Sequence, residues 1–401
     1  MAVVIIGGGQ GGFQVAASLR AEGYQEPITL IGDEPNIPYQ RPPLSKGFLL
    51  GKQEQRHAEL RPAAFYETQR ITLVTARVAA IDRASRRVTL DSGEHIEYDT
   101  LVLATGARNR VLPHGNVLYL RTLGEATEIR QRLAAANDVV VIGGGFIGLE
   151  VAAAARTLNK QVTVIESQSR LMARVVAPAV SEYFRAQHEA KGVDVILNAK
   201  LSGINDQEVL LGERTRRPAD LVIAGIGVEP NIELAREAGL PVGNGITVNE
   251  YLQTPDERIF AIGDCAESPS SYASSDAGAL CRLESVQNAV DQAACVAKAI
   301  VGHRAPYGAV PWFWTDQYDI HLQMAGLPTG FDQVVTRGDP ETRKFSVFYY
   351  RAGKLCAVDS VNRPADHLAA RKLIGARATL SPDQAKDESF DLKSPVLTDG
   401  A

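Results

Sequence analysis

Two stretches of the chain carry three glycines at the spacing that lets a phosphate approach a helix end. The first is VVIIGGGQGGFQVAA (Val3–Ala17), in which Gly7, Gly9 and Gly12 follow a short apolar run. The first glycine allows a tight turn, the second lets a pyrophosphate approach the backbone, and the third lets helix and strand pack closely. The helix that follows offers free N–H groups and partial positive charge to an anion. The spacing predicts a dinucleotide site.

The same pattern recurs later in the chain. The sequence VVVIGGGFIGLEVAA (Val139–Ala153) supplies Gly143, Gly145 and Gly148. One glycine-rich turn is weak evidence, but here each copy follows a predicted strand and opens a predicted helix. The duplication therefore predicts two Rossmann units and two bound dinucleotides.

Each unit continues to a second predicted strand that ends in an acid. ITLIGDE contains Asp33, and VTVIE ends at Glu166. A carboxylate at this place accepts hydrogen bonds from ribose hydroxyls and repels a 2′-phosphate. The residues after Glu166 are Ser, Gln and Ser, and only then Arg170. We therefore expect NADH rather than NADPH at the second unit.

Three further predicted strands end in residues suited to a nearby cofactor. They are DTLVLATG (Asp99–Gly106), DLVIAGIG (Asp220–Gly227) and RIFAIGDC (Arg258–Cys265). Small residues are needed where the backbone passes close to a ligand. Those expected at the cofactors are Ala104, Thr105, Gly106 and Gly227. Asp264, in the third strand, is placed to bind a ribityl hydroxyl.

Composition narrows the class of protein. The chain has 401 residues, 45% of them hydrophobic and 22% charged, with a formal net charge of −5. This balance gives no argument for nucleic acid or an anionic membrane surface, and no apolar run approaches the ~18 residues of a membrane span. The cysteines show no CxxC pair or metal-ligand spacing: Cys265, Cys281, Cys295 and Cys356. We expect reduced thiols, no bound metal and a cytoplasmic location.

The order of these motifs resembles that of FAD-dependent pyridine-nucleotide disulfide oxidoreductases, over nearly the whole chain. The resemblance implies an α/β fold with two Rossmann-like domains, as in glutathione reductase, and an α+β C-terminal domain. The implied domains are FAD-binding in two parts (1–109 and 241–318), NADH-binding (110–240) and C-terminal (319–401).

Three longer motifs indicate the branch of this family. YQRPPLSK (Tyr39–Lys46) has no cysteine where disulfide reductases carry a redox pair. Together with RLESVQNA (Arg282–Ala289) and PWFWTDQY (Pro311–Tyr318), it resembles the oxygenase-coupled NADH-dependent ferredoxin reductases. The resemblance implies hydride transfer from NADH to FAD, then single-electron transfer to a 2Fe–2S ferredoxin. That ferredoxin would serve a cytochrome P450 monooxygenase or a ring-hydroxylating, Rieske-type dioxygenase.

The resemblance also implies roles for individual residues. It places Lys46 and Glu150 together near the flavin N5, where an ammonium stabilises the negative charge of reduced flavin and a carboxylate keeps it charged. It places Trp312 at the dimethylbenzene edge of the flavin. The other implied contacts are Gly11, Asp33, Arg41, Val78, Arg121, Asp264 and Val286 with FAD, and Ile147 with NAD.

Docking of an acidic ferredoxin should use basic side chains. The candidates are Arg61, Arg70, Arg282, Arg304, Arg371 and Lys372. Several alternatives stay open, namely a rubredoxin as acceptor, an NADH oxidase or peroxidase, a coenzyme A disulfide reductase, and an NADH-sensing flavoprotein. The chain is expected to be a monomer or homodimer. The acidic stretch Asp383–Asp399 is expected to form an arm over the C-terminal domain, without an assigned task.

Overall fold

The computed structural model describes residues 1–113, 115–273 and 279–394. The chain divides into two compact units, each made of three separate segments. Unit 1 comprises Met1–Gln40, Glu59–Arg108 and Glu229–Pro311. Unit 2 comprises Arg41–Ala58, Asn109–Val228 and Trp312–Ala401. The short strands β8 (Ala107–Asn109) and β17 (Val228–Pro230) lie where the chain passes between the units.

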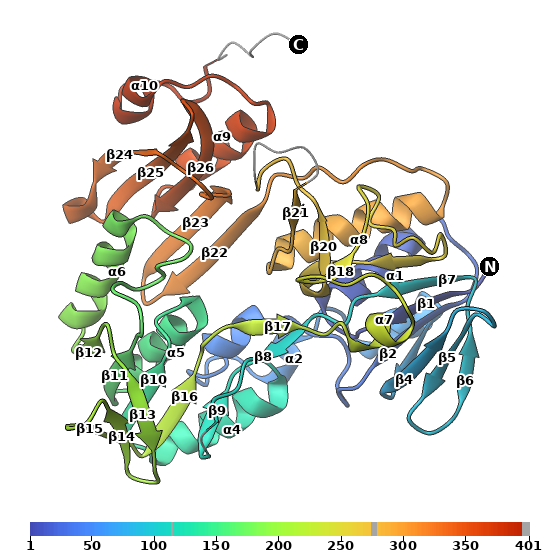
Figure 1. The fold of residues 1–401 in the computed structure, drawn as a ribbon, viewed down its shortest axis with the longest axis horizontal. Coiled ribbons are helices and arrows are strands. Elements are labelled where there is room, and N and C mark those ends of the chain that lie inside the picture. The colour runs from blue at the N-terminus through green and yellow to red at the C-terminus, as the bar shows by residue number, and fades with distance from the viewer. Residues whose placement is uncertain (114, 274–278, 395–401) are drawn as a thin grey trace. The chain divides into compact units, whose positions relative to one another are not determined.

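Unit 1 is built on a five-stranded parallel sheet of order β19-β7-β1-β2-β3 (Figure 1). The strands are β1 (Val3–Ile6), β2 (Ile28–Gly32), β3 (Ile71–Thr75), β7 (Thr100–Leu103) and β19 (Ile259–Ala261). Helices α1 (Gln10–Ala21) and α8 (Val286–Ile300) pack against each other. The strand residues Ile5 and Leu103 are fully buried, as expected for a parallel sheet with both faces covered.

Smaller elements complete unit 1. An antiparallel sheet contains β4 (Val78–Asp82), β5 (Arg87–Leu90) and β6 (His95–Glu97). A second small sheet contains β18 (Ile246–Thr247), β20 (Ala266–Pro269) and β21 (Leu280–Cys281). The short helices are α3 (Ala63–Thr68), α7 (Glu233–Glu237) and the 3-10 turn η2 (Gly263–Cys265).

Unit 2 contains a second five-stranded parallel sheet, of order β12-β11-β10-β16-β9. Its strands are β9 (Val117–Tyr119), β10 (Asp138–Ile142), β11 (Gln161–Ile165), β12 (Val193–Ile196) and β16 (Leu221–Ala224). Its helical elements are η1 (Pro42–Ser45), α2 (Gln55–Ala58), α4 (Leu123–Ala135), α5 (Phe146–Thr157) and α6 (Pro178–Ala190). An antiparallel sheet contains β13 (Leu201–Ile204), β14 (Glu208–Leu211) and β15 (Thr215–Pro218).

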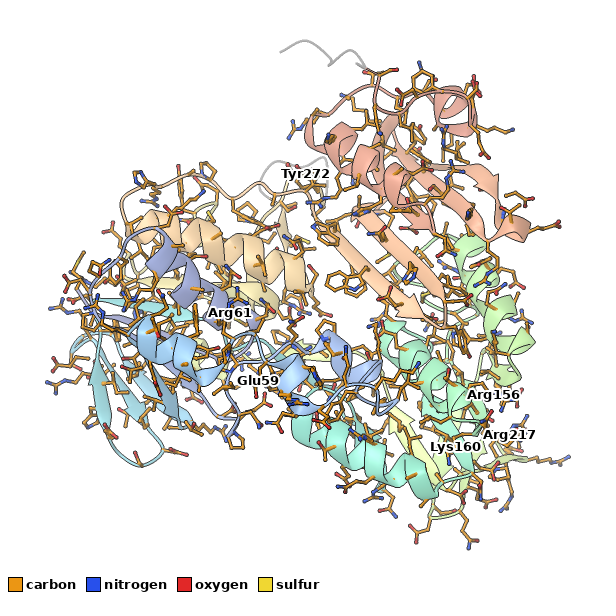
Figure 2. All side chains as sticks on the ribbon, turned by 180° about the vertical axis from the view of Figure 1, so that it is seen from behind. Glu59, Arg61, Arg156, Lys160, Arg217 and Tyr272 are labelled. Atoms are coloured by element: carbon orange, nitrogen blue, oxygen red, sulfur yellow. The ribbon has the colours of Figure 1, made fainter. Side chains whose placement is uncertain are left out.

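Two basic side chains fix the far end of α5 (Figure 2). The guanidinium of Arg156 donates to the carbonyl oxygens of Lys191, at 2.6 Å, and Lys160, at 2.8 Å. The ammonium of Lys160 donates to the carbonyl oxygen of Ala136 at 2.7 Å. These bonds satisfy carbonyl groups beyond the helix and tie α5 to the loops around it.

Unit 2 also contains an antiparallel sheet of order β22-β23-β26-β25-β24. Its strands are β22 (Trp312–Gln317), β23 (Ile320–Gly326), β24 (Gln333–Asp339), β25 (Lys344–Arg351) and β26 (Lys354–Val361). The helical elements here are η3 (Pro340–Thr342), α9 (Pro364–Gly375) and α10 (Pro382–Lys386), and α9 packs on β23 and β26. The predicted fold class of two Rossmann-like sheets and an α+β C-terminal part is confirmed. The predicted domain boundaries stay predictions.

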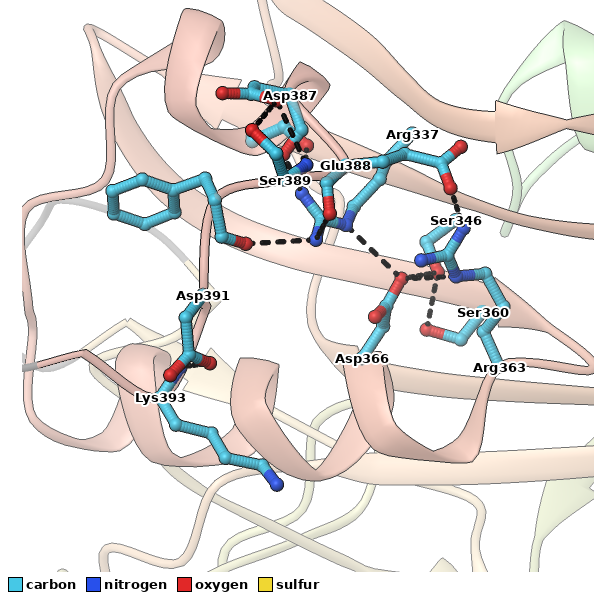
Figure 3. A network of polar contacts seen from close by, with 12 residues as sticks. Arg337, Ser346, Ser360, Arg363, Asp366, Asp387, Glu388, Ser389, Asp391 and Lys393 are labelled. Carbon is cyan, nitrogen blue, oxygen red and sulfur yellow. Dashed lines mark hydrogen bonds and ion pairs between the residues drawn. The ribbon is translucent and has the colours of Figure 1, made fainter.

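The acidic stretch Asp383–Asp399 is described as far as Ser394, and residues 395–399 lie outside the described residues. Arg337 of β24, which is 5% exposed, holds this stretch (Figure 3). Its guanidinium donates to the carbonyl oxygens of Phe390, at 3.0 Å, Glu388, at 3.2 Å, and Asp387. The described part of the acidic stretch is therefore an arm packed on the C-terminal sheet.

Replacing Arg337 with methionine is expected to destabilise this sheet by about 3 kcal/mol, because backbone carbonyls would stay buried without their charged donor. Both tryptophans of the chain, Trp312 and Trp314, lie in β22. Urea unfolding followed by tryptophan fluorescence therefore reports on the affected sheet. The exposed Lys344, replaced in the same way, is the control, and an equal loss in both variants would contradict the role given to Arg337.

Candidate functional site

The turn after β1 is the first of two places shaped for a phosphate. Gly7 has a φ of +120°, and a Cβ there would lie 2.1 Å from the carbonyl oxygen of Ala104. A Cβ on Gly12 would lie 2.0 Å from the carbonyl oxygen of Gly7, so glycine is required for α1 to pack this closely. Gly9 is the N-cap of α1, and a Cβ there would meet none of the described atoms within 4 Å. No described side chain caps the first turn of α1, and the open space at Gly9 leaves room for a pyrophosphate.

Other predicted FAD residues lie at the same edge of the unit 1 sheet. A Cβ on Gly11 would lie 3.3 Å from Ile262 Cδ1 and 3.8 Å from Ala104 Cβ. The hydroxyl of Thr105 donates to the carbonyl oxygen of Asn231 at 2.7 Å, and the Asn231 amide donates to the Thr105 carbonyl at 2.8 Å. Strands β1, β7 and β19 are parallel, so the residues that follow them share one edge. Ligands of open parallel sheets bind at this edge.

The remaining predicted residues of unit 1 are more scattered along the chain. Asp33 is exposed directly after β2, whose carboxyl end lies at the same sheet edge. Asp264 lies in η2, and Val286 is the first residue of α8, which packs on η2. Gly106 has a φ of +66°. Val78 opens β4 and is 5% exposed.

The turn after β10 is the second place shaped for a phosphate. Gly143 has a φ of +104°, and a Cβ there would lie 2.4 Å from the carbonyl oxygen of Gly225. A Cβ on Gly148 would lie 2.1 Å from the carbonyl oxygen of Gly143. Gly145 is the N-cap of α5, and no described side chain caps it. Ile147, in the first turn of α5, leaves 39% of its surface exposed, so an apolar side chain stands beside the turn.

Glu166 lies at the carboxyl end of β11, beside this second turn. Its Oε2 accepts a hydrogen bond from the Gly144 N–H at 2.7 Å, and its Oε1 accepts one from the Gln168 N–H at 2.8 Å. Gly227, with a φ of +102°, follows β16 at the same edge of the sheet. Carboxylate oxygens have further acceptor capacity, so Glu166 can also bind ribose hydroxyls.

The guanidinium of Arg170 is engaged by the loop that follows it. This group donates to the carbonyl oxygens of Val176, at 2.7 Å, and Ala173, at 2.5 Å. It also donates to the hydroxyl of Ser181 at 2.8 Å. Arg170 therefore holds the loop at residues 171–177 together.

The C-terminal sheet also contacts this loop. The hydroxyl of Tyr349 accepts a hydrogen bond from the Ala177 N–H at 2.7 Å and donates to the carboxyl group of Asp359. Burial raises the pKa of Asp359 to about 7 and raises the pKa of Tyr349 above its usual range. The nucleotide loop and the C-terminal sheet thus share one buried polar contact.

The structure brings together the predicted pair Lys46 and Glu150. The Lys46 Nζ lies 2.8 Å from Glu150 Oε2, and the Ser45 hydroxyl donates to the same oxygen at 2.5 Å. The Thr315 hydroxyl donates to Glu150 Oε1 at 2.6 Å. Glu150 is 6% exposed, so these three donors satisfy a buried carboxylate. Their role in chemistry stays a prediction.

Other predicted FAD residues of unit 2 also have close neighbours. The guanidinium of Arg41 donates to the carbonyl oxygen of Arg121 at 2.5 Å. The guanidinium carbon of Arg371 lies 4.8 Å from the centre of the Trp312 ring, and the His367 ring centre lies 5.5 Å away. Burial lowers the pKa of His367 to about 4, so this ring is neutral at pH 7. Arg371 and His367 therefore both pack against the Trp312 ring.

The basic side chains predicted for docking differ in exposure. The side chain of Arg282 is 8% exposed, lies 2.7 Å from Glu284 and donates to the carbonyl oxygen of Asp264. The expectation that Arg282 belongs to an exposed surface is therefore wrong, because this guanidinium holds the segment before α8. Arg61, labelled in Figure 2, is exposed. So are Arg70, Arg304 and Lys372, while Arg371 is half-buried.

Within residues 1–113, 115–273 and 279–394, no helix is long and apolar enough to cross a membrane. In the same part of the chain, no three His, Cys, Asp or Glu side chains are grouped as metal ligands.

Sequence reasoning missed four polar residues around Glu150. Ser45 and Thr315 donate to its carboxylate, and Gln317 and His188 lie behind Thr315. Both Thr315 and Gln317 occur in the motif PWFWTDQY, at alternate positions of β22. The run of polar residues that ends this strand, Thr315, Asp316 and Gln317, was the available signal.

The chain can now be compared with known proteins. The family model "Pyridine nucleotide-disulphide oxidoreductase" matches residues 1–293, and the model "Reductase C-terminal" matches residues 312–396. Rhodocoxin reductase from Rhodococcus erythropolis is 49% identical, covering 99% of this chain and 94% of its own. The first family model alone covers most of the chain.

Two solved structures are similar over almost the full length. The ferredoxin reductase for the CYP199A2 system from Rhodopseudomonas palustris has a TM-score of 0.95 at 48% identity, covering 99% of this chain and 100% of that one. The putidaredoxin reductase chain of a covalent complex with putidaredoxin has a TM-score of 0.94 at 44% identity, covering 98% and 97%. The chain therefore belongs to the pyridine nucleotide-disulphide oxidoreductase family, and this membership implies an oxidoreductase with FAD and NADH as cofactors.

Proposed function

We propose that the chain is an FAD-containing, NADH-dependent ferredoxin reductase. It takes hydride from NADH onto FAD and passes electrons singly to a 2Fe–2S ferredoxin. That ferredoxin serves a cytochrome P450 monooxygenase or a ring-hydroxylating dioxygenase. The relatives named for a ferredoxin or for a P450-linked system support this acceptor, because they match almost the full chain.

The observation that carries this proposal is the chemistry of the turn that ends at Lys46. The turn Pro42–Ser45 contains no sulfur, and it presents an ammonium paired with Glu150. All four cysteines are free, and burial raises the pKa of every one of them: Cys265, Cys281, Cys295 and Cys356. Since the thiolate is the reactive form of cysteine, none of these thiols is activated for disulfide chemistry. The electrons must therefore leave to an external acceptor.

The described residues fit both cofactors. The uncapped start of α1 would hold the FAD pyrophosphate, and Asp33 the adenosine ribose. Asp264 and Val286 would hold the ribityl chain and the pyrimidine end of the flavin, and Val78 would lie against adenine. Further FAD contacts are assigned to Gly7, Gly9, Gly11, Gly12, Ala104, Thr105, Gly106, Arg41 and Arg121. Bound FAD supplies the hydride acceptor and the single-electron donor.

Lys46, Glu150 and Trp312 are assigned to the reacting end of the flavin. The Lys46 ammonium would stabilise negative charge near N5, and Glu150 would hold that ammonium in place. Trp312 would pack on the flavin edge, with its free rotation limited by Arg371.

The NADH site is assigned to the second glycine turn. The uncapped start of α5 would hold the pyrophosphate, with contacts from Gly143, Gly145, Ile147, Gly148 and Gly227. Glu166 would bind the ribose hydroxyls. Because Arg170 is occupied by the loop at 171–177, it is not offered to a 2′-phosphate, which favours NADH over NADPH.

Ferredoxin docking is assigned to the exposed or half-buried basic side chains Arg61, Arg70, Arg304, Arg371 and Lys372. Complementary charge raises the association rate, so the rate of ferredoxin reduction should fall as salt rises. A cytoplasmic location belongs to the same proposal, and the predicted state of monomer or homodimer stays a prediction.

The test is NADH-driven reduction of cytochrome c by the FAD-loaded protein, with and without a 2Fe–2S ferredoxin. We expect a large rise in rate with ferredoxin, and much less turnover with NADPH. A rubredoxin replacing the ferredoxin tests the alternative acceptor, and oxygen consumption without any acceptor protein tests an oxidase. If NADH bleaches the flavin and neither iron protein accelerates turnover, the proposed acceptor is wrong and the cofactor assignment stands.

A further inference from the structure

A chain of buried hydrogen bonds ends at Glu150. Its carboxylate receives the Thr315 hydroxyl on Oε1, and the Ser45 hydroxyl and Lys46 ammonium on Oε2. Thr315 is completely buried. Its hydroxyl donates the hydrogen bond to Oε1, so the orientation of the carboxylate depends on how Thr315 itself is held.

Three more residues continue the chain behind Thr315. The side-chain amide nitrogen of Gln317 lies 3.4 Å from the Thr315 hydroxyl oxygen. The other end of that amide, Oε1, lies 2.8 Å from His188 Nε2. The hydroxyl of Tyr318 lies 3.3 Å from His188 Nδ1. Thr315, Gln317 and His188 are each 0% exposed.

The chemistry of the end group fixes the direction of every bond. A carboxylate only accepts, so the Thr315 hydroxyl donates to Glu150 and must accept from the Gln317 amide N–H. The amide oxygen of Gln317 then faces His188 and accepts from Nε2–H. Burial lowers the pKa of His188, so the ring is neutral and carries one proton. That proton lies on Nε2, and Nδ1 accepts from Tyr318.

We propose that His188 and Gln317 are positioning residues for the Glu150–Lys46 pair. The hydrogen bonds run in one direction, from Tyr318 through His188, Gln317 and Thr315 to Glu150. They fix the rotamer of Thr315, which fixes the carboxylate plane of Glu150 and so the place of the Lys46 ammonium. This inference rests on the proposed function, because it assigns the pair to the flavin.

The first test uses a matched set of variants of the FAD-loaded protein. In His188→Met the donor to Gln317 is lost at similar volume, and in His188→Gln an amide N–H takes the place of Nε2–H. In Ser346→Ala a different fully buried hydrogen bond of the same unit is lost, between Ser346 and Asp366. The readouts are the rate constant for flavin reduction by NADH without any acceptor protein, the flavin reduction potential, and the melting temperature.

We expect His188→Met to lower the rate constant about fivefold, the effect of one lost net hydrogen bond, and to make the potential more negative. His188→Gln should recover most of both losses. Ser346→Ala should lower the melting temperature and leave the rate constant and the potential as in the unsubstituted protein. If His188→Met and Ser346→Ala behave alike, His188 has only a structural role and the proposal is wrong.

The second test measures the direction of these hydrogen bonds in the absence of turnover. Nitrogen NMR of the histidine-labelled holoprotein should show His188 as the neutral Nε2–H tautomer, and Gln317→Met should remove that preference. A wild-type ring protonated on Nδ1 would overturn the direction of the chain. Neither test uses ferredoxin. Both can therefore be read even if the protein does not reduce ferredoxin and the proposed function is wrong.

Discussion

Replacing Lys46 with methionine is expected to slow the reduction of bound FAD by NADH about 100-fold, as expected for loss of one preorganised electrostatic partner of a developing charge. The Lys46 Nζ lies 2.8 Å from Glu150 and is the positive group that we propose stabilises reduced flavin. Glu150 would keep two hydroxyl donors, from Ser45 and Thr315, so the fold should survive. The measurement is single-turnover bleaching of the flavin absorbance after mixing with NADH.

The exposed Lys52 provides the matched control, because it lies in the same segment of unit 2. Lys52→Met removes the same charge from the whole protein without touching Glu150. Equal rates for the two variants would show that Lys46 acts only through the overall charge, and the assignment of Lys46 to the flavin would fail.

Replacing Gly148 with alanine is expected to abolish turnover with NADH. The added Cβ would lie 2.1 Å from the carbonyl oxygen of Gly143, a backbone atom that cannot move aside. Helix α5 would have to shift from β10, at a cost of about 3 kcal/mol. The shift would also displace Glu150, which lies on the same helix. Steady-state turnover and thermal unfolding should both be impaired.

Gly145→Ala separates binding from stability at the same turn. Gly145 has a φ of −83°, which any residue adopts, and a Cβ there would lie 4.0 Å from its nearest described neighbour. We expect normal thermal unfolding and about tenfold weaker NADH binding, since the methyl group would occupy the path of the pyrophosphate. A variant that binds NADH as tightly as the parent would show that the pyrophosphate does not cross this turn.

The glycine turns could be predicted from the sequence because their requirement is local. Gly7 and Gly143 need a positive φ, and Gly12 and Gly148 need to lack a Cβ beside a nearby carbonyl oxygen. Such demands leave a fixed spacing in the chain. The acids after β2 and β11 belong to the same short strand–turn–helix–strand units. The sequence therefore predicted the sheet edges and the two dinucleotide sites together.

The polar residues behind Glu150 could not be predicted in this way. Thr315 and Gln317 lie on one face of β22, while Trp312 lies on the other. The interpretation of that motif considered only its tryptophans. His188 reaches Gln317 from α6, far away in the sequence. Arg282 shows a different error. The sequence suggests that this charged side chain is exposed, but in the structure it is buried beside Glu284.

The segment Arg41–Ala58 belongs to unit 2 although it is translated long before the rest of that unit. It supplies Ser45 and Lys46, two of the three groups that neutralise or solvate Glu150. During synthesis the buried contacts of this segment can form only after α5 has been made. The contact of Thr315 with Glu150 requires β22, which is made later still. A contiguous graft beginning at Asn109 would therefore leave the Glu150 carboxylate without its cation. A transplanted nucleotide-binding module needs the early segment as a separate, second piece.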